Sequence, residues 1–170
     1  MNKWYVLYVK TGYEDDAKHV IERDIKEVNV KVFKEEIFER RQGKNRTIIK
    51  PLYPGYVFIN CELTEPIYYG LVGTPGVIKI LGTRTVDGGC PIPVPENEMS
   101  EILGYQQNEE IIKMSEAIVV NGKIKILSGP LMGKEKYIFK LDKRKGKVKV
   151  YTKLFDKLKS AYFGIKIKEP

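Results

Sequence analysis

The spacing of apolar residues changes near the middle of this 170-residue chain, and that change constrains the fold more than any other feature. Up to about residue 107, stretches with helical spacing of apolar residues alternate with stretches typical of strands. From Gly122 onward, short stretches of alternating apolar and polar residues follow one another, with no helical stretch between them. The chain is therefore expected to form an α+β domain followed by a small all-β domain.

The first 107 residues predict helices packed on an antiparallel sheet. Apolar residues recur at spacings of three and four over 17–28, and shorter helical stretches occupy 66–72 and 96–107. Strand-like stretches lie between and around them, at 4–8, 30–40, 47–50, the second half of 51–59, and 76–82. This order of elements is typical of an α+β sandwich.

The rest of the chain predicts a small β-barrel. Alternating stretches occur at 123–127, 137–141, 147–151 and 161–167, with a turn at 128–133 and a polar, basic hairpin at 142–146. The residues between the last predicted helix and the first of these strands show neither helical spacing nor alternation of apolar residues. We therefore predict an N-terminal domain over residues 1–107, a linker over 108–120 and a barrel over 121–170.

Charge divides the chain at nearly the same place. Residues 1–112 hold 14 Lys and Arg against 17 Asp and Glu, a net −3, and residues 113–170 hold 16 against 5, a net +11; together these give the chain's +8. A small domain this basic usually binds phosphate, on RNA, DNA or an anionic surface. The alternative is a lysine-rich surface that serves only solubility.

Catalytic, metal-binding and cofactor-binding patterns are absent from the sequence. The chain's one histidine, His19, stands far from any nucleophile motif, and Gly-Lys-Glu at 133–135 lacks the spacing of a phosphate-binding loop. Cys61 and Cys90 form no disulfide framework and no zinc-ligand cluster. We therefore expect no enzymatic activity, no cofactor and no metal.

Membrane and export signals are also missing. No stretch approaches the roughly 20 apolar residues that a membrane span needs. The apolar run Trp4–Val9 is too short for the core of a signal peptide. We expect a cytoplasmic monomer without a membrane partner.

Several segments, in order along nearly the whole chain, resemble the NusG family of transcription factors. Residues 3–8 are similar to that family's first strand, and Glu14 stands at the expected place in its first helix. The Pro51–Phe58 run resembles the family signature, in which an aromatic residue precedes Pro-Gly-Tyr and a strand. Residues 74–82 are similar to a later strand, and Gly122–Val150 resembles the KOW motif of the family's C-terminal barrel.

This resemblance implies that the N-terminal domain binds bacterial RNA polymerase, at the clamp helices of the largest subunit. The matching residues are Tyr8, Tyr53, Pro54 and Tyr56. Tyrosine suits an interface because its ring is large and rigid and its hydroxyl is polar. Core packing is the alternative for these tyrosines. We expect Tyr53 to be exposed, because its turn is flanked by prolines, and Trp4 to lie in the core.

The C-terminal barrel departs from that of a general NusG, which is fairly neutral and meets a ribosomal protein or the Rho termination factor. One 20-residue segment of this barrel, residues 134–153, is rich in cationic side chains: Lys134, Lys136, Lys140, Lys143, Arg144, Lys145, Lys147, Lys149 and Lys153. Tyr137 and Phe139 are interleaved with them, and strand alternation is expected to bury some of these rings.

The Lys143–Lys145 tip is similar to that of LoaP, a group of specialised paralogs that promotes readthrough of long biosynthetic operons. The similarity implies an antitermination factor whose basic barrel binds an RNA hairpin in the transcript leader. Proteins recognise A-form RNA mainly through its shape, its backbone and its distorted or single-stranded features. A general NusG that binds a ribosomal protein or Rho, and a ribosome-associated KOW protein, are the alternatives.

Overall fold

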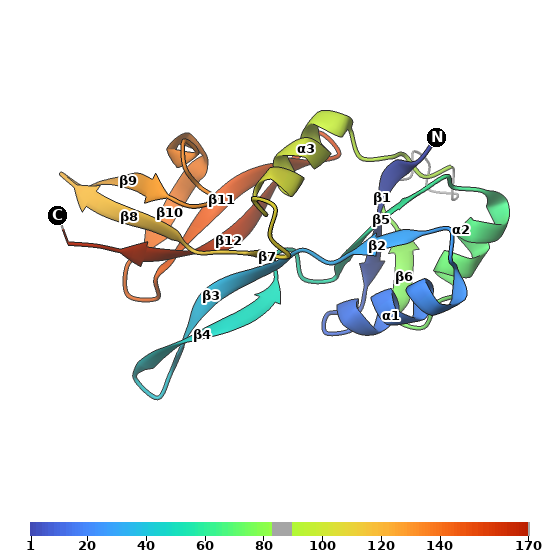
Figure 1. Cartoon of the computed structure of the whole chain (residues 1–170), viewed down its shortest axis with the longest axis horizontal. Coiled ribbons are helices and arrows are strands. Elements are labelled where there is room, and N and C mark those ends of the chain that lie inside the picture. The colour runs from blue at the N-terminus through green and yellow to red at the C-terminus, as the bar shows by residue number, and fades with distance from the viewer. Residues whose placement is uncertain (83–89, 170) are drawn as a thin grey trace. The chain divides into compact units, whose positions relative to one another are not determined.

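The computed structural model describes residues 1–82 and 90–169 (Figure 1). These residues form two compact units. The first comprises residues 1–33 and 53–99, and the second comprises residues 34–52 and 100–170. Helices and strands both contribute, so the predicted α+β fold class is confirmed.

A four-stranded sheet with the order β2-β5-β1-β6 organises the first unit. Its strands are β1 (Lys3–Val9), β2 (Asn29–Lys31), β5 (Tyr56–Cys61) and β6 (Val77–Ile80). All neighbours are antiparallel, and β1 runs against β5 from the Lys3–Cys61 pair to the Tyr8–Tyr56 pair. This register places Tyr8 directly opposite Tyr56 at the end of the two strands.

Two helices pack on this sheet: α1 (Glu14–Asp24) and α2 (Glu65–Val72). Ala17 and Ile21, one helical turn apart on α1, are fully buried in one apolar cluster with strand residues such as Leu7 and Val57. Leu71 of α2 joins the same cluster. Acidic residues occupy the first turn of α1, where their negative charges interact favourably with the positive end of the helix dipole.

The first unit differs from the sequence prediction in two places. The stretch 30–40, predicted as one strand, is two strands, β2 and β3 (Lys34–Arg41), which belong to different units. Trp4, expected in the core, is only half-buried. Trp4 lies on the face of β1 opposite to Tyr5, Leu7 and Val9, whose side chains belong to the apolar cluster of the unit.

A five-stranded sheet with the order β10-β11-β12-β8-β9 organises the second unit. Its strands are β8 (Ser115–Val120), β9 (Lys123–Ser128), β10 (Ile138–Asp142), β11 (Lys147–Leu154) and β12 (Lys157–Ile167), with a short 3-10 helix η1 (Glu135–Tyr137) before β10. Val148, Val150, Phe163 and Ile165 are buried at no more than 1% exposure and form its core. This arrangement is consistent with a KOW barrel.

A second sheet of three strands belongs to the same unit and has the order β4-β3-β7, where β4 is Lys44–Pro51 and β7 is Ile111–Ile112. Strand β3 crosses β12 at Gly164. A Cβ atom at Gly164 would lie 2.6 Å from the carbonyl oxygen of Glu36 and 3.2 Å from the Cα of Ile37. Only glycine therefore allows the two backbones to approach this closely.

The stretch 108–120, predicted as a linker, contains β7 and β8. The two-residue strand β7 has no periodicity that the sequence could reveal. The helix α3 (Glu96–Gly104) lies within the predicted 96–107 helix, with Met99 and Ile102 buried. The exact domain boundaries stay a prediction.

Candidate functional site

The first candidate site combines Tyr8, near the end of β1, with the tight turn after β4 that is formed by Tyr53, Pro54, Gly55 and Tyr56. We call these five residues the aromatic knuckle. The amide of Tyr56 donates to the carbonyl oxygen of Tyr53 at 3.0 Å and closes the turn. Gly55 adopts a φ of +83°, and a Cβ there would lie 3.1 Å from the carbonyl oxygen of Val9 and 3.2 Å from the Tyr8 ring. Glycine is therefore required at this position for both conformation and space.

Glu14 holds the knuckle in place from α1. Its carboxylate is 4% exposed and accepts hydrogen bonds from the amide of Gly12 at 3.1 Å and from the amide of Gly55 at 2.9 Å. A buried carboxylate of this kind joins the turn before α1 to the knuckle with charge-assisted hydrogen bonds. From the sequence, Glu14 was predicted only to lie in the first helix. Its hydrogen bond to Gly55, 41 residues away, was not predicted.

The rings of the knuckle pack on one another. The Tyr8 and Tyr56 centroids are 6.0 Å apart and edge-on, and the Tyr53 and Tyr56 centroids are 6.0 Å apart and stacked. Tyr53 is only 2% exposed, so the expectation that it is exposed is wrong. The Tyr56 and Phe58 rings, each 6.0 Å from it, explain its burial. Pro54 is exposed, and Tyr8 and Tyr56 are half-buried.

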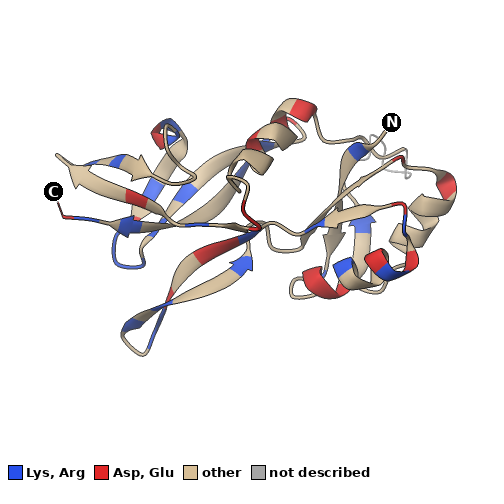
Figure 2. Cartoon of the chain, viewed as in Figure 1, with Lys and Arg blue, Asp and Glu red and all other residues tan. Residues whose placement is uncertain are grey.

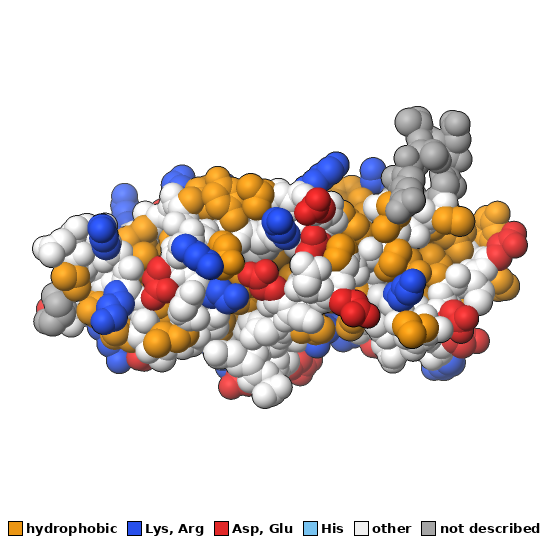
Figure 3. All heavy atoms as spheres, turned by 90° about the horizontal axis from the view of Figure 1, so that it is seen from above, with side chains coloured by type: hydrophobic (Ala, Val, Ile, Leu, Met, Phe, Trp, Pro, Cys, Tyr) orange, Lys and Arg blue, Asp and Glu red, His pale blue; other side chains and the backbone are white. Residues whose placement is uncertain are grey.

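The second candidate site lies on the outward side of β10, β11 and β12, which we call the basic face. Along β11 the side chains alternate strictly, with Val148, Val150 and Thr152 inward. The outward residues are Lys147, Lys149, Tyr151 and Lys153 of β11, with Lys140 of β10 and Tyr162 of β12 beside them. Figure 2 shows Lys and Arg on each of these strands, and Figure 3 shows basic side chains interspersed with hydrophobic ones on the surface seen from above.

A shallow pocket in the basic face brings four of the predicted lysines together. It is lined by Lys140, Asp142, Lys145, Lys147, Lys149 and Tyr162. The Lys147 Nζ lies 4.3 Å and the Lys149 Nζ 5.2 Å from the centroid of the Tyr162 ring. Cation–π contacts hold both ammonium groups over the ring. Four cations around one hollow suit an anionic group such as a phosphate.

A family comparison identifies the chain's relatives. The family model described as "Transcription termination factor nusG" matches residues 2–103. The chain belongs to the NusG family. The Bacillus subtilis "Transcription termination/antitermination protein NusG" is 28% identical over 159 residues, which cover 89% of each chain. The protein of that name from Thermus thermophilus is 30% identical over 169 residues and 90% of each chain.

A solved structure described as "Domain interaction in Thermotoga maritima NusG" has a similar fold. Its TM-score is 0.56 at 23% identity, and the match covers 96% of this chain and 94% of that one. The family model and the 30% identical relative confirm the resemblance to the NusG family. The finer resemblance to LoaP stays a prediction.

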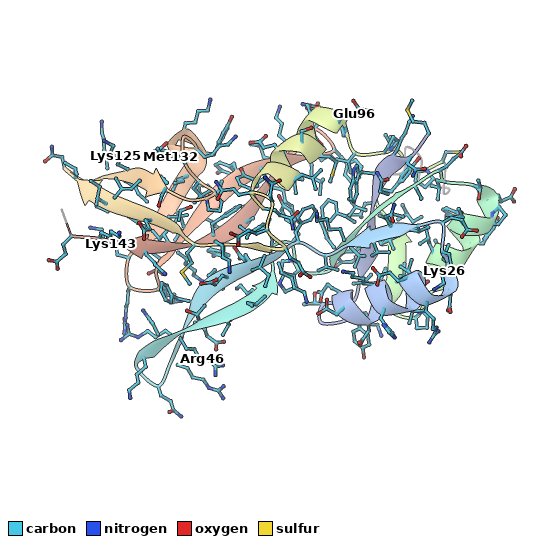
Figure 4. All side chains as sticks on the ribbon, viewed as in Figure 1. Lys26, Arg46, Glu96, Lys125, Met132 and Lys143 are labelled. Atoms are coloured by element: carbon cyan, nitrogen blue, oxygen red, sulfur yellow. The ribbon has the colours of Figure 1, made fainter. Side chains whose placement is uncertain are left out.

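The other five predicted cations of this NusG-family chain lie outside the pocket. Lys143 and Arg144 are exposed in the turn between β10 and β11, where Figure 4 labels Lys143. Lys153 lies farther along β11, 3.7 Å from Asp156. Lys134 and Lys136 flank the Tyr137 ring at η1, at the opposite end of β10 from that turn.

Two aromatic rings contribute to the basic face: Tyr162, which was not predicted from the sequence, and Phe139, whose burial the sequence left open. Tyr162 lines the pocket although it is 13 residues beyond Lys149 in the chain, because β12 returns antiparallel to β11 and pairs Tyr162 with Lys149. Phe139 is 43% exposed, although strand alternation was expected to bury some of the rings. A β-bulge in β10 accounts for its exposure.

The second unit also holds a buried carboxyl whose charge interacts with a lysine of the basic face. Glu35 of β3 is 1% exposed, and its Oε2 has no hydrogen-bond partner among the described residues. Burial raises the pKa of Glu35 well above its ordinary value, and the charges of Lys50 and Lys147 offset that rise only in part. Lys147, one of the pocket lysines, is therefore among the charges that act on this carboxyl.

Residues 1–82 and 90–169 also bear on metal binding, membrane insertion and thiol chemistry. No group of three or more His, Cys, Asp or Glu side chains there is placed to hold a metal ion. No helix in the same residues is long and apolar enough to cross a membrane. Cys61 and Cys90 are both free, and burial raises the pKa of the Cys61 thiol to about 11.

Proposed function

We propose that this NusG-family protein is a cytoplasmic, monomeric and non-catalytic antitermination factor. Its N-terminal domain binds the clamp helices of RNA polymerase, and its basic barrel binds an RNA hairpin in the leader of the transcript. It thereby promotes readthrough of its target operons. The observation that carries the RNA-binding part is the pocket of Lys140, Lys145, Lys147 and Lys149 around Tyr162.

The aromatic knuckle supports the polymerase contact. Pro54 is exposed and Tyr8 and Tyr56 present part of their rings, while Glu14 and Gly55 hold the turn rigid. A preorganised aromatic surface loses little conformational entropy on binding. In this proposal Tyr53 supports the contact from beneath, because only 2% of it is exposed.

The position of the cations supports RNA as the ligand of the barrel. Lys140, Lys145, Lys147 and Lys149 converge on one hollow, and Lys143 and Arg144 extend from the adjacent turn. The pocket and this exposed tip together match a backbone that presents phosphates on two sides of a groove.

A gel-shift assay with the full chain and its own upstream leader RNA tests the proposal. If four lysines contact phosphates, the slope of log affinity against log salt should be about −2.8 to −3.6. Arg144→Ala and Lys145→Ala should weaken binding more than Lys44→Ala, an exposed lysine of the β3–β4 hairpin. A flat salt dependence, or equal affinity for any RNA hairpin, would contradict specific recognition.

A general NusG role is the second candidate, and the names of the relatives favour it. Matches at 28% and 30% identity over about nine-tenths of this chain carry the general name. In that role the barrel would bind a ribosomal protein or Rho, and its lysines would only be solvated. Binding to the ribosomal partner without RNA binding would select this role, and failure to bind the clamp helices would select a ribosome-associated KOW protein.

A further inference from the structure

Two aromatic rings stand exposed on the basic face, and neither belongs to the pocket. Phe139 of β10 is 43% exposed and Tyr151 of β11 is 39% exposed. Their centroids are 3.9 Å apart with an angle of 17° between the planes, so they form one stacked pair. We call this pair the aromatic platform. Burying rings normally stabilises a fold, so two stacked rings left in solvent need a reason.

A β-bulge creates the platform. Ile138 pairs with Val150 and Lys140 pairs with Lys149, so two steps along β10 match one step along β11, and Phe139 is the extra residue. In a regular ladder Phe139 and Lys140 would point to opposite faces. The bulge leaves both exposed, and it places the Phe139 ring against Tyr151, which faces outward by the alternation of β11.

Cations surround the platform. Lys149 Nζ lies 5.9 Å from the Phe139 centroid and also lines the pocket. Tyr151 stands between Lys149 and Lys153 on the same side of β11, about 7 Å from each along the strand. A protein partner with an apolar surface would meet charges on both sides of the rings. A nucleotide would satisfy both features, because its base is a flat π-system and its phosphate is an anion.

We propose that the aromatic platform stacks an unpaired base of the bound RNA, while the adjacent lysine pocket holds the backbone phosphates of the same strand. This inference rests on the proposed RNA-binding function and deepens it. Stacking on exposed aromatic rings beside a positively charged groove is a general means of holding single-stranded nucleic acid. The platform would make the barrel prefer RNA with a loop or bulge over a fully paired duplex of the same length.

The test compares two RNAs, a hairpin with an unpaired loop and a fully paired duplex of matched length, with the full chain. Phe139→Leu and Tyr151→Leu should weaken binding to the looped RNA about 5- to 100-fold, and should leave duplex binding and the salt slope unchanged. Phe139→Tyr and Tyr151→Phe keep a ring and should bind normally. Tyr69→Leu, at a ring that is 62% exposed in the first unit, is the matched control.

A second readout follows the base itself. A 2-aminopurine placed in the loop should be quenched by the wild-type chain and by Phe139→Tyr, and less so by Phe139→Leu. An unchanged ratio of looped to duplex affinity in both leucine variants would overturn the platform while leaving the lysine pocket intact. Absence of RNA binding by the wild-type chain would overturn this inference and the proposed function together.

Discussion

The aromatic knuckle and the basic face differ in where they place their charged groups: the knuckle buries its charge, and the basic face exposes its charges. In the knuckle one buried carboxylate, Glu14, braces a turn whose central tyrosine is 2% exposed. On the basic face the charges are outside, and the alternation of β11 directs Lys147, Lys149 and Lys153 outward. The conformation of the knuckle therefore depends on buried packing and hydrogen bonds, whereas the basic face consists of exposed charges on paired strands. Substitutions should consequently damage the first through stability and the second through affinity.

The largest expected effect is that of Glu14→Ala. It leaves the buried amide of Gly55 and that of Gly12 without their acceptor, and hydrogen bonds to a charged group contribute about 1.5–3 kcal/mol each. We expect the free energy of unfolding of the first unit to fall by roughly 2–4 kcal/mol. Chemical denaturation measures it.

Glu14→Gln is the matched control, since its amide oxygen keeps one acceptor for Gly55 and should recover part of the loss. RNA affinity should be unchanged in both variants. A loss of RNA binding in folded Glu14→Ala would show that the two sites are not independent.

The double change Lys147→Ala with Lys149→Ala should act on affinity rather than stability. Both ammonium groups lie at the pocket over Tyr162, so the salt slope of RNA binding should become less steep by about 1 for each lysine removed. Melting temperature should change little, because the backbone and the inward side chains of β11 are unaffected. Lys26→Ala, at an exposed lysine of the first unit, should leave the slope as it is.

The charge of Glu35 should make stability depend on pH. Because burial raises its pKa in the folded chain, stability is fully present below the unfolded pKa of about 4.3 and is lost as pH rises through the folded pKa. Glu35→Gln should remove this dependence and stabilise the protein at high pH by on the order of 1–3 kcal/mol.

Thermal unfolding of wild type and Glu35→Gln from pH 4 to 9 measures this effect. Parallel curves across that range would show that Glu35 does not titrate with folding. A change in RNA affinity of Glu35→Gln at neutral pH would show that the core carboxyl acts on Lys147.

The smallest expected effect is that of Lys134→Ala. Lys134 pairs with Glu101 at 3.5 Å on a partly exposed surface, and such pairs contribute at most about 1 kcal/mol. RNA binding should also change little, because η1 lies at the opposite end of β10 from the turn that borders the pocket. A large loss of RNA affinity would extend the binding surface beyond the basic face.

Much of the architecture could be read from periodicity. Long stretches with a regular pattern, such as the helix that includes Ala17 and Ile21, are helices or strands in the structure because burial of one face imposes that spacing. Prediction failed where ring packing or strand pairing decides. Tyr53 is buried by the rings of Tyr56 and Phe58, and the two-residue strand β7 exists only because β3 pairs with it.

The sequence by itself determined the family, the α+β class and the concentration of cations in the last third of the chain. These depend on local patterns and composition, which folding does not alter. Only the tertiary structure decided which cations converge, that Tyr162 joins Lys147 and Lys149, and that a bulge turns Phe139 toward Tyr151. Strand pairing and register bring together residues distant in the chain, and a shift of one residue reverses which side chains share a face.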